Sequence, residues 1–142
     1  MGNDFRMKVL IEVTSEIERD GETDRMHQLL NGEWFCRGDA YTLRYVEEEE
    51  KITTLIRWRA KEEEIVIIRQ GAANLRLVIA PGQSLQTVYA TPFGQHLMNV
   101  VTQHLDMDIT DLGGTFRIAY QSDFNDGDKS EHRMIISFSI LS

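Results

Sequence analysis

Residues 7–18 read MKVLIEVTSEIE and alternate in polarity along their length. Val9, Ile11, Val13 and Ile17 fall on one face, and the opposite face is mostly charged. Successive side chains of a strand point to opposite faces, whereas a helix repeats every 3.6 residues. The stretch therefore predicts a β-strand that buries one face.

The same period continues to the end of the chain. It predicts strands over residues 7–18, 24–36, 41–47, 52–59, 64–70, 73–80, 84–91, 96–108, 115–124 and 131–141. Turn signals separate many of them, namely Asp20-Gly21, Arg37-Gly38-Asp39, Pro81-Gly82, Gly113-Gly114 and residues 125–128. Short connections favour antiparallel neighbours. The fold class is therefore all-β, a single antiparallel up-and-down β-barrel of about 8–10 strands.

Three local features refine this prediction. Residues 95–108 also fit a helical stripe, but β-branched Val100, Val101 and Thr102 favour a strand. Gly32 suggests a bulge that bends the second strand. Residues 1–6 read as a frayed end.

Composition limits the classes of protein. The chain has 142 residues, 42% hydrophobic and 27% charged, which predicts one globular domain over residues 1–142. It contains no apolar run of membrane-spanning length and no secretory signal pattern. Cys36 is the only cysteine, so an intrachain disulfide is excluded, which fits the cytoplasm. The net charge of −8 argues against nucleic-acid binding.

Catalytic and metal-binding motifs are not found. The four histidines lack metal-ligand spacing; they are His27, His96, His104 and His132. The acidic stretches Glu47–Glu50 and Glu62–Glu64 read as solvated hairpin tips. There is no serine-nucleophile elbow, phosphate loop or dinucleotide fingerprint. We therefore assign no catalytic residue, metal or cofactor, and an enzymatic role is disfavoured without being excluded.

Arg69 is the most informative charged residue. It shares a strand face with Ile65 and Ile67, while Val66 and Ile68 share the other face. Both faces are mostly apolar, so the strand is covered on both sides or its outer face meets a partner. If the Ile65 face is inward, Arg69 points into the barrel near its mouth and needs a carboxylate from the protein or from a ligand.

Other strands supply the walls of this interior. The inward sets are Tyr41, Leu43 and Tyr45; Leu85, Thr87, Tyr89 and Thr91; Phe116, Ile118 and Tyr120; and Met134, Ile136, Phe138 and Ile140. Apolar walls with a few hydroxyls and one cation suit a small amphipathic or acidic molecule. The candidate ligand contacts are Arg69, Tyr45, Tyr89 and Thr91. A core filled by its own side chains is the competing explanation.

An ordered set of short motifs resembles a known family. These are Tyr45-Val46-Glu47-Glu48, Arg69-Gln70-Gly71, Tyr89-Ala90-Thr91-Pro92-Phe93-Gly94, Thr102 and Gly114-Thr115-Phe116-Arg117-Ile118-Ala119-Tyr120. Over about residues 8–140 the chain resembles the YwiB-like family of uncharacterised bacterial proteins, described as calycin-like β-barrels. The resemblance implies a bacterial cytoplasmic barrel and no established activity. Calycin relatives such as lipocalins hold hydrophobic ligands, which is an analogy of fold.

Three functions remain open at this point. The leading one is a non-enzymatic barrel that binds a small amphipathic or acidic molecule, with no nucleic acid and no membrane as partner. The alternative is a filled barrel that acts as a protein-interaction or assembly module, in one form a homodimer. The third is an enzyme that uses His104 or His132 at the barrel mouth.

Overall fold

The described residues form strands and turns. The structure is a computed structural model that describes residues 4–59, 61–124, 127 and 129–141. The strands are β1 (Phe5–Arg19), β2 (Glu22–Arg37), β3 (Ala40–Glu47), β4 (Ile52–Arg59), β5 (Ile65–Gly71), β6 (Leu75–Ile79), β7 (Ser84–Thr91), β8 (Gly94–Thr110), β9 (Gly113–Phe124) and β10 (Lys129–Ile140). The all-β prediction is confirmed, and residues 95–108 lie in strand β8.

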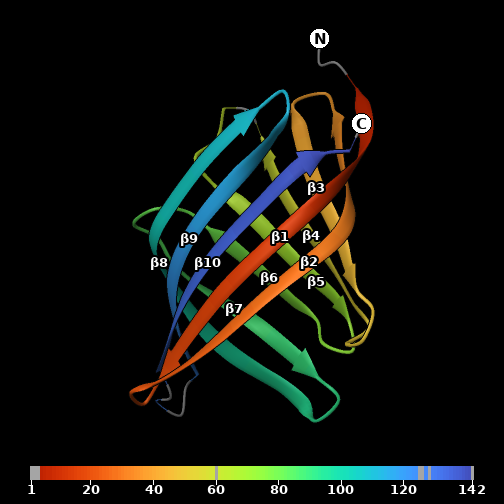
Figure 1. Cartoon of the computed structure of the whole chain (residues 1–142). Helices are drawn as coiled ribbons and strands as arrows, with labels where there is room; N and C mark the ends of the chain where they lie inside the picture. Colours follow the sequence, from red (N-terminus) through yellow and green to blue (C-terminus); the bar gives the residue numbers. More distant parts are fainter. Residues whose placement is uncertain (1–3, 60, 125–126, 128, 142) are drawn as a thin grey trace.

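One sheet wraps into a nearly closed barrel (Figure 1). Its order is β6-β5-β4-β3-β2-β1-β10-β9-β8-β7, and every ladder is antiparallel. The chain runs up and down, and its two ends meet where β10 pairs with β1. Between β6 and β7 the described residues show a single bridge, Asn74 with Ala90. The barrel therefore has one weakly joined seam, and both chain termini lie at the same end (Figure 1).

An aromatic cluster fills the end of the barrel that holds the termini. Trp34 lies between Phe5 and Phe138, with ring centroids 5.0 Å and 4.8 Å away. Trp58 packs edge-on against Phe116 at 4.8 Å. Below this cluster, inward residues such as Val9, Ile11, Leu43, Ile56, Ile65 and Ile136 are fully buried. Large rings and branched side chains leave little space in a barrel of this size, so this end is a packed core.

The predicted bulge at Gly32 is wrong. Gly32 keeps regular pairing with Val9 on one side and Tyr45 on the other, and the irregular register lies between Thr102 and His104 of β8. A Cβ at position 32 would collide with the Arg44 carbonyl oxygen and the Ile11 side chain. Glycine is therefore needed here for close approach inside a continuous strand.

Two predicted boundaries also change. Phe5 and Arg6 belong to β1, because Phe5 pairs with Cys36 and packs on Trp34, so this part is not frayed. Gly113 and Gly114 begin β9, and the turn precedes them. Of the predicted turn at residues 125–128, only Gly127 lies within the described residues. The described residues include no helix of the length and apolarity needed to cross a membrane.

Candidate functional site

A cavity of about 370 Å³ lies at the end of the barrel opposite the aromatic cluster. It is formed where β1, β5, β7 and β9 end and where β6, β8 and β10 begin. Its apolar walls are Ile17, Leu75, Met98, Phe124 and Met134. Its polar lining is Ser15, Glu16, Arg19, Arg69, Tyr89, Tyr120, Ser122 and His132. The volume falls in the range of small-molecule pockets, roughly 300–1,000 Å³.

Arg69 is held at this cavity by strand register and by a buried carboxylate. Cross-strand pairing places Tyr45, Thr54 and Arg69 in one row on the inner face. The Nη2 atom of Arg69 lies 3.3 Å from Oε1 of Glu47. The Glu47 side chain is 9% exposed, whereas the Arg69 side chain is 35% exposed and lines the cavity. Burial raises the pKa of the Glu47 carboxyl, and the Arg69 charge opposes that shift.

Two buried phenols lie within electrostatic reach of Arg69. Burial raises the pKa of Tyr45 to about 12, and the Glu47 charge acts in the same direction. Burial also raises the pKa of Tyr120 to about 12, while the Arg69 charge acts to lower the pKa of both phenols. Both phenols are therefore neutral at physiological pH and can donate hydrogen bonds.

A second polar group faces Arg69 from β1, β9 and β10. Ser122 Oγ lies 2.9 Å from Nε2 of His132, whose ring stacks on Tyr120 with centroids 4.4 Å apart. Burial lowers the pKa of His132 to about 4, and the charge of Arg19 acts in the same direction. Arg19 donates from Nε to Ser130 Oγ at 2.9 Å. This side of the cavity therefore holds a neutral imidazole, a hydroxyl and a second guanidinium.

The half-buried His132 predicts an acid-labile fold. Its folded pKa of about 4 lies below the unfolded value of 6.5, so the unfolded chain binds the proton first as the pH falls. The contribution of neutral His132 to the free energy of unfolding is fully present above pH 6.5 and is lost as the pH falls toward 4. After discounting for partial exposure, we expect this loss to be about 2 kcal/mol larger in the native protein than in His132→Gln.

Urea melts at pH 7 and pH 4 measure this difference. The variant His104→Gln changes an exposed histidine and serves as the control, so it should follow the native protein at both pH values. Equal pH dependence in His132→Gln and the native protein would show that His132 is protonated in the folded state without penalty.

The structure separates the four predicted ligand contacts. Arg69 and Tyr89 both line the cavity. Tyr45 is buried in the same cross-strand row as Arg69 and does not line the cavity. Thr91 does not lie in the cavity, because its hydroxyl closes the β7–β8 turn, accepting from the Phe93 amide at 3.1 Å and donating to the Gly94 carbonyl at 3.3 Å. Alternation alone could not distinguish a side chain at the mouth from one in the turn.

Sequence reasoning missed several cavity residues. Arg19 has the same parity as Val13 and Ile17, so its inward position could have been inferred from the first strand. The ion pair between Glu47 and Arg69 could not have been inferred from the sequence, because it depends on the register of three strands. Cys36 is buried, and burial, with the charges of Asp4 and Asp39, raises the pKa of its thiol, so it is a poor nucleophile.

Metal-ligand clusters are not found in the part of the chain that the structure describes, where no three His, Cys, Asp or Glu side chains converge. His27 forms an exposed contact with Glu12 at 3.1 Å between Nε2 and Oε2. His104 is exposed outside the cavity. Of the two histidines considered for an enzyme, only His132 therefore lies at the cavity.

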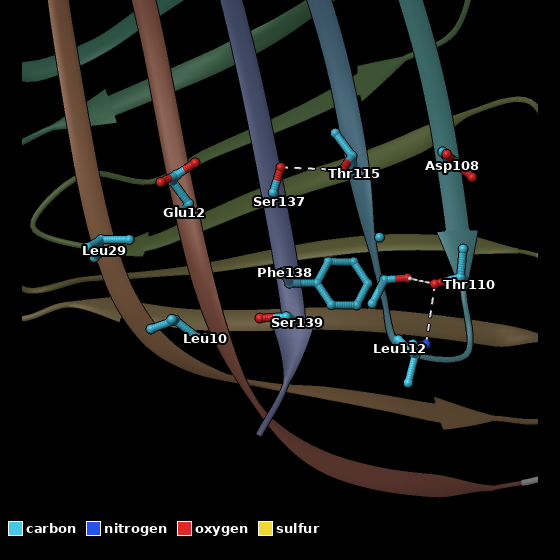
Figure 2. A pocket seen from close by; sticks show the side chains of 12 residues that line it. Leu10, Glu12, Leu29, Asp108, Thr110, Leu112, Thr115, Ser137, Phe138 and Ser139 are labelled. Carbon is cyan, nitrogen blue, oxygen red and sulfur yellow. Dashed lines mark hydrogen bonds between the residues drawn. The ribbon is translucent and has the colours of Figure 1, made fainter. Parts of the chain in front are cut away.

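A separate groove of about 470 Å³ lies on the outer face of β1, β2 and β8–β10 (Figure 2). Leu10, Leu29 and Leu112 line it and are exposed. The Thr115 and Ser137 hydroxyls are 3.3 Å apart across its floor. This groove is shallow and mixed in polarity, and the described residues that line it include no lysine or arginine.

Comparisons with known proteins agree with the barrel. A family model described as "Domain of unknown function (DUF1934)" matches residues 11–136. The chain is 25% identical over 132 residues to the "Uncharacterized beta-barrel protein YwiB" of Bacillus subtilis (strain 168), covering 92% of each chain. It also superposes on the crystal structure of the ywiB protein from Bacillus subtilis with a TM-score of 0.84 at 22% identity, covering 96% of this chain and 94% of that one.

Proposed function

From the premise that this chain belongs to the DUF1934 family of domains of unknown function, we propose that it is a non-enzymatic barrel that binds a small amphipathic anion. The favoured head group is a carboxylate. It would meet Arg69 at the cavity, with Tyr89, Tyr120 and Arg19 as further polar contacts. The apolar part of the ligand would lie against Leu75, Met98, Phe124 and Met134.

The half-exposed Arg69 is the observation that carries this proposal. Its contact with Glu47 involves one guanidinium nitrogen, Nη2. A guanidinium has five N–H donors, so it can hold Glu47 and still offer donors to a second carboxylate. Partial burial strengthens such a bond relative to one at the open surface. The apolar walls then favour a ligand that is amphipathic rather than simply ionic.

Binding is favoured over catalysis by the state of His132. A general base works best when its pKa is near the working pH. The pKa of His132 is lowered to about 4, so its neutral imidazole is a weak base toward Ser122. Within the described residues, His132 forms no hydrogen bond with a carboxylate that would hold or activate its ring. The Ser122–His132 pair is better suited to hydrogen-bonding a ligand.

The cellular location, the cytoplasm, is also a proposal. A single free cysteine, Cys36, is compatible with a reducing cytoplasm. Lipocalin-like barrels hold ligands in their interior, and the cavity at one end of this barrel has the space for a similar use. That analogy concerns the fold and not the identity of the ligand.

Anilinonaphthalene sulfonate, a small fluorescent amphipathic anion, tests the proposal. We expect Glu47→Gln to bind the probe several-fold more tightly than the native protein, because it releases Arg69 and removes a negative charge. Glu47→Gln combined with Arg69→Leu should lose tenfold or more in affinity, because no cation remains in that row. Fluorescence titration of the native protein and both variants measures the three dissociation constants.

A matched control separates this site from general charge effects. Arg133→Leu removes an exposed arginine from the outer face of β10 and should leave the affinity unchanged within twofold. Octanoate should displace the probe from the native protein, and octylamine should not. Equal affinities in Glu47→Gln and in the double variant would remove Arg69 from the site and contradict the proposal.

A further inference from the structure

A second cationic surface lies on the outside of the barrel, over β2–β6. Cross-strand pairing places Thr42, Arg57 and Val66 in one outward row. The neighbouring row holds Ile68 beside Arg76. A groove of about 520 Å³ lies among these side chains, and its arginines are Arg37, Arg57, Arg59 and Arg76. We call it the arginine groove.

The arginines of this groove are mostly unneutralised. Arg59 lies 3.5 Å from Asp39 through Nη1 and Oδ1, and both side chains are exposed. The side chains of Arg37, Arg57 and Arg76 form no ion pair or hydrogen bond with any described residue. Four cations thus gather on one face of a chain whose net charge is −8. Arginine matches carboxylates with two parallel bonds, and here that capacity is unused.

Apolar side chains lie between these arginines. Val66 and Ile68 point out of the barrel and are nevertheless half-buried. Together with the inward Ile65 and Ile67, they make β5 apolar on both of its faces. Cations interspersed with apolar side chains suit an extended segment that presents both acidic and apolar residues on one face, at every second position, because side chains of a strand repeat every two residues.

We propose that the arginine groove docks an acidic, partly apolar peptide segment of a partner protein. The occupant follows from charge complementarity and from the apolar floor. A nucleic acid fits the groove less well. The face of the Phe35 ring is covered by the Arg6 guanidinium at 4.9 Å, which removes it as a stacking platform. Glu62 and Glu64 also line the groove beside the four arginines; they repel a strand with a charge at every phosphate more than a segment with only a few carboxylates.

Fluorescence anisotropy with a short labelled peptide that repeats Glu-Ser-Leu-Ser, so that Glu and Leu share one face of an extended chain, tests the proposal on the full chain. The groove variant is Arg57→Glu with Arg76→Glu. The control is Arg117→Glu with Arg133→Glu, which makes the same charge change on the outer face of β9 and β10. Thermal melts establish that each variant is folded. Arg57→Gln with Arg76→Gln serves as a milder second variant, with the same expected direction of change.

Saturable binding at physiological salt that weakens tenfold or more in the groove variant, and less than twofold in the control, supports the proposal. The same peptide with Lys in place of Glu should not bind. Equal weakening in groove and control variants overturns it, because the attraction is then a diffuse charge effect. Absence of saturable binding also overturns it, as does tighter binding of a single-stranded oligonucleotide than of the peptide.

Discussion

Phe116→Ala should lower the free energy of unfolding by about 3–5 kcal/mol, the usual cost of deleting a buried aromatic ring. Phe116 is 0% exposed and contacts both Trp58 and Phe138 at the closed end of the barrel. The rings around it come from different strands, so the barrel cannot easily contract into the space left by the deletion. Urea unfolding of the native protein and the variant measures the loss.

Phe93 provides a matched control for this substitution. Its side chain is 95% exposed in the β7–β8 turn, so Phe93→Ala deletes the same ring without creating a cavity. We expect it to change the stability by less than about 0.5 kcal/mol. The probe affinity of Phe116→Ala should also stay within twofold of the native value, because the open end is formed by other side chains. A stability loss below about 1.5 kcal/mol for Phe116→Ala would show that the closed end is loosely packed.

Arg69→Leu should lower the free energy of unfolding by about 3 kcal/mol at pH 8, the lower end of the range for breaking a buried ion pair. The lower end applies because the Arg69 side chain is 35% exposed. The loss has its origin in Glu47, which stays buried as an uncompensated carboxylate. The sequence alone leaves open whether a carboxylate of the protein or of a ligand balances Arg69, and the contact with Glu47 at 3.3 Å shows that the protein supplies one.

The pH dependence and a second variant test this origin. Without Arg69 the pKa of Glu47 rises further, so the folded variant takes up a proton more readily than the unfolded chain. Its loss of stability should therefore shrink as the pH falls from 8 to 5. Adding Glu47→Gln should recover most of the stability at pH 8. A double variant as unstable as Arg69→Leu would mean that the arginine stabilises the barrel through packing rather than charge.

Much of the strand layout could be predicted because its signals are local. The period of two in residues 7–18 places Val9, Ile11 and Val13 inside, and all three are buried. Asp20 and Gly21 both have positive φ, as the predicted tight hairpin requires. The exceptions are informative. The irregular register lies between Thr102 and His104 and not at Gly32, because a glycine signals either irregular pairing or close approach, and only the surrounding strands select one.

The candidate site could be predicted only in part. Parity places Arg69 and Tyr89 at the cavity, because parity fixes the face of a strand. Parity does not show how far along the barrel axis a side chain lies. It therefore predicts the same site for Thr91, although the Thr91 hydroxyl closes a turn. His132 was considered only for its position near the mouth. Its burial against Tyr120 and its bond to Ser122 depend on how β9 and β10 pair.

The sequence by itself determined the alternation of faces, the positions of most turns and hence the up-and-down order of strands. Each of these depends on residues close together in the chain, and short connections leave antiparallel pairing as the simplest arrangement. Only the tertiary structure decided which side chains meet across strands. It closed one end of the barrel with Trp34, Trp58 and Phe116, left the other end hollow around Arg69, and gathered four arginines from three strands on one outer face. The physical reason is that register and barrel closure depend on the summed packing of all ten strands, so no short stretch of sequence contains them.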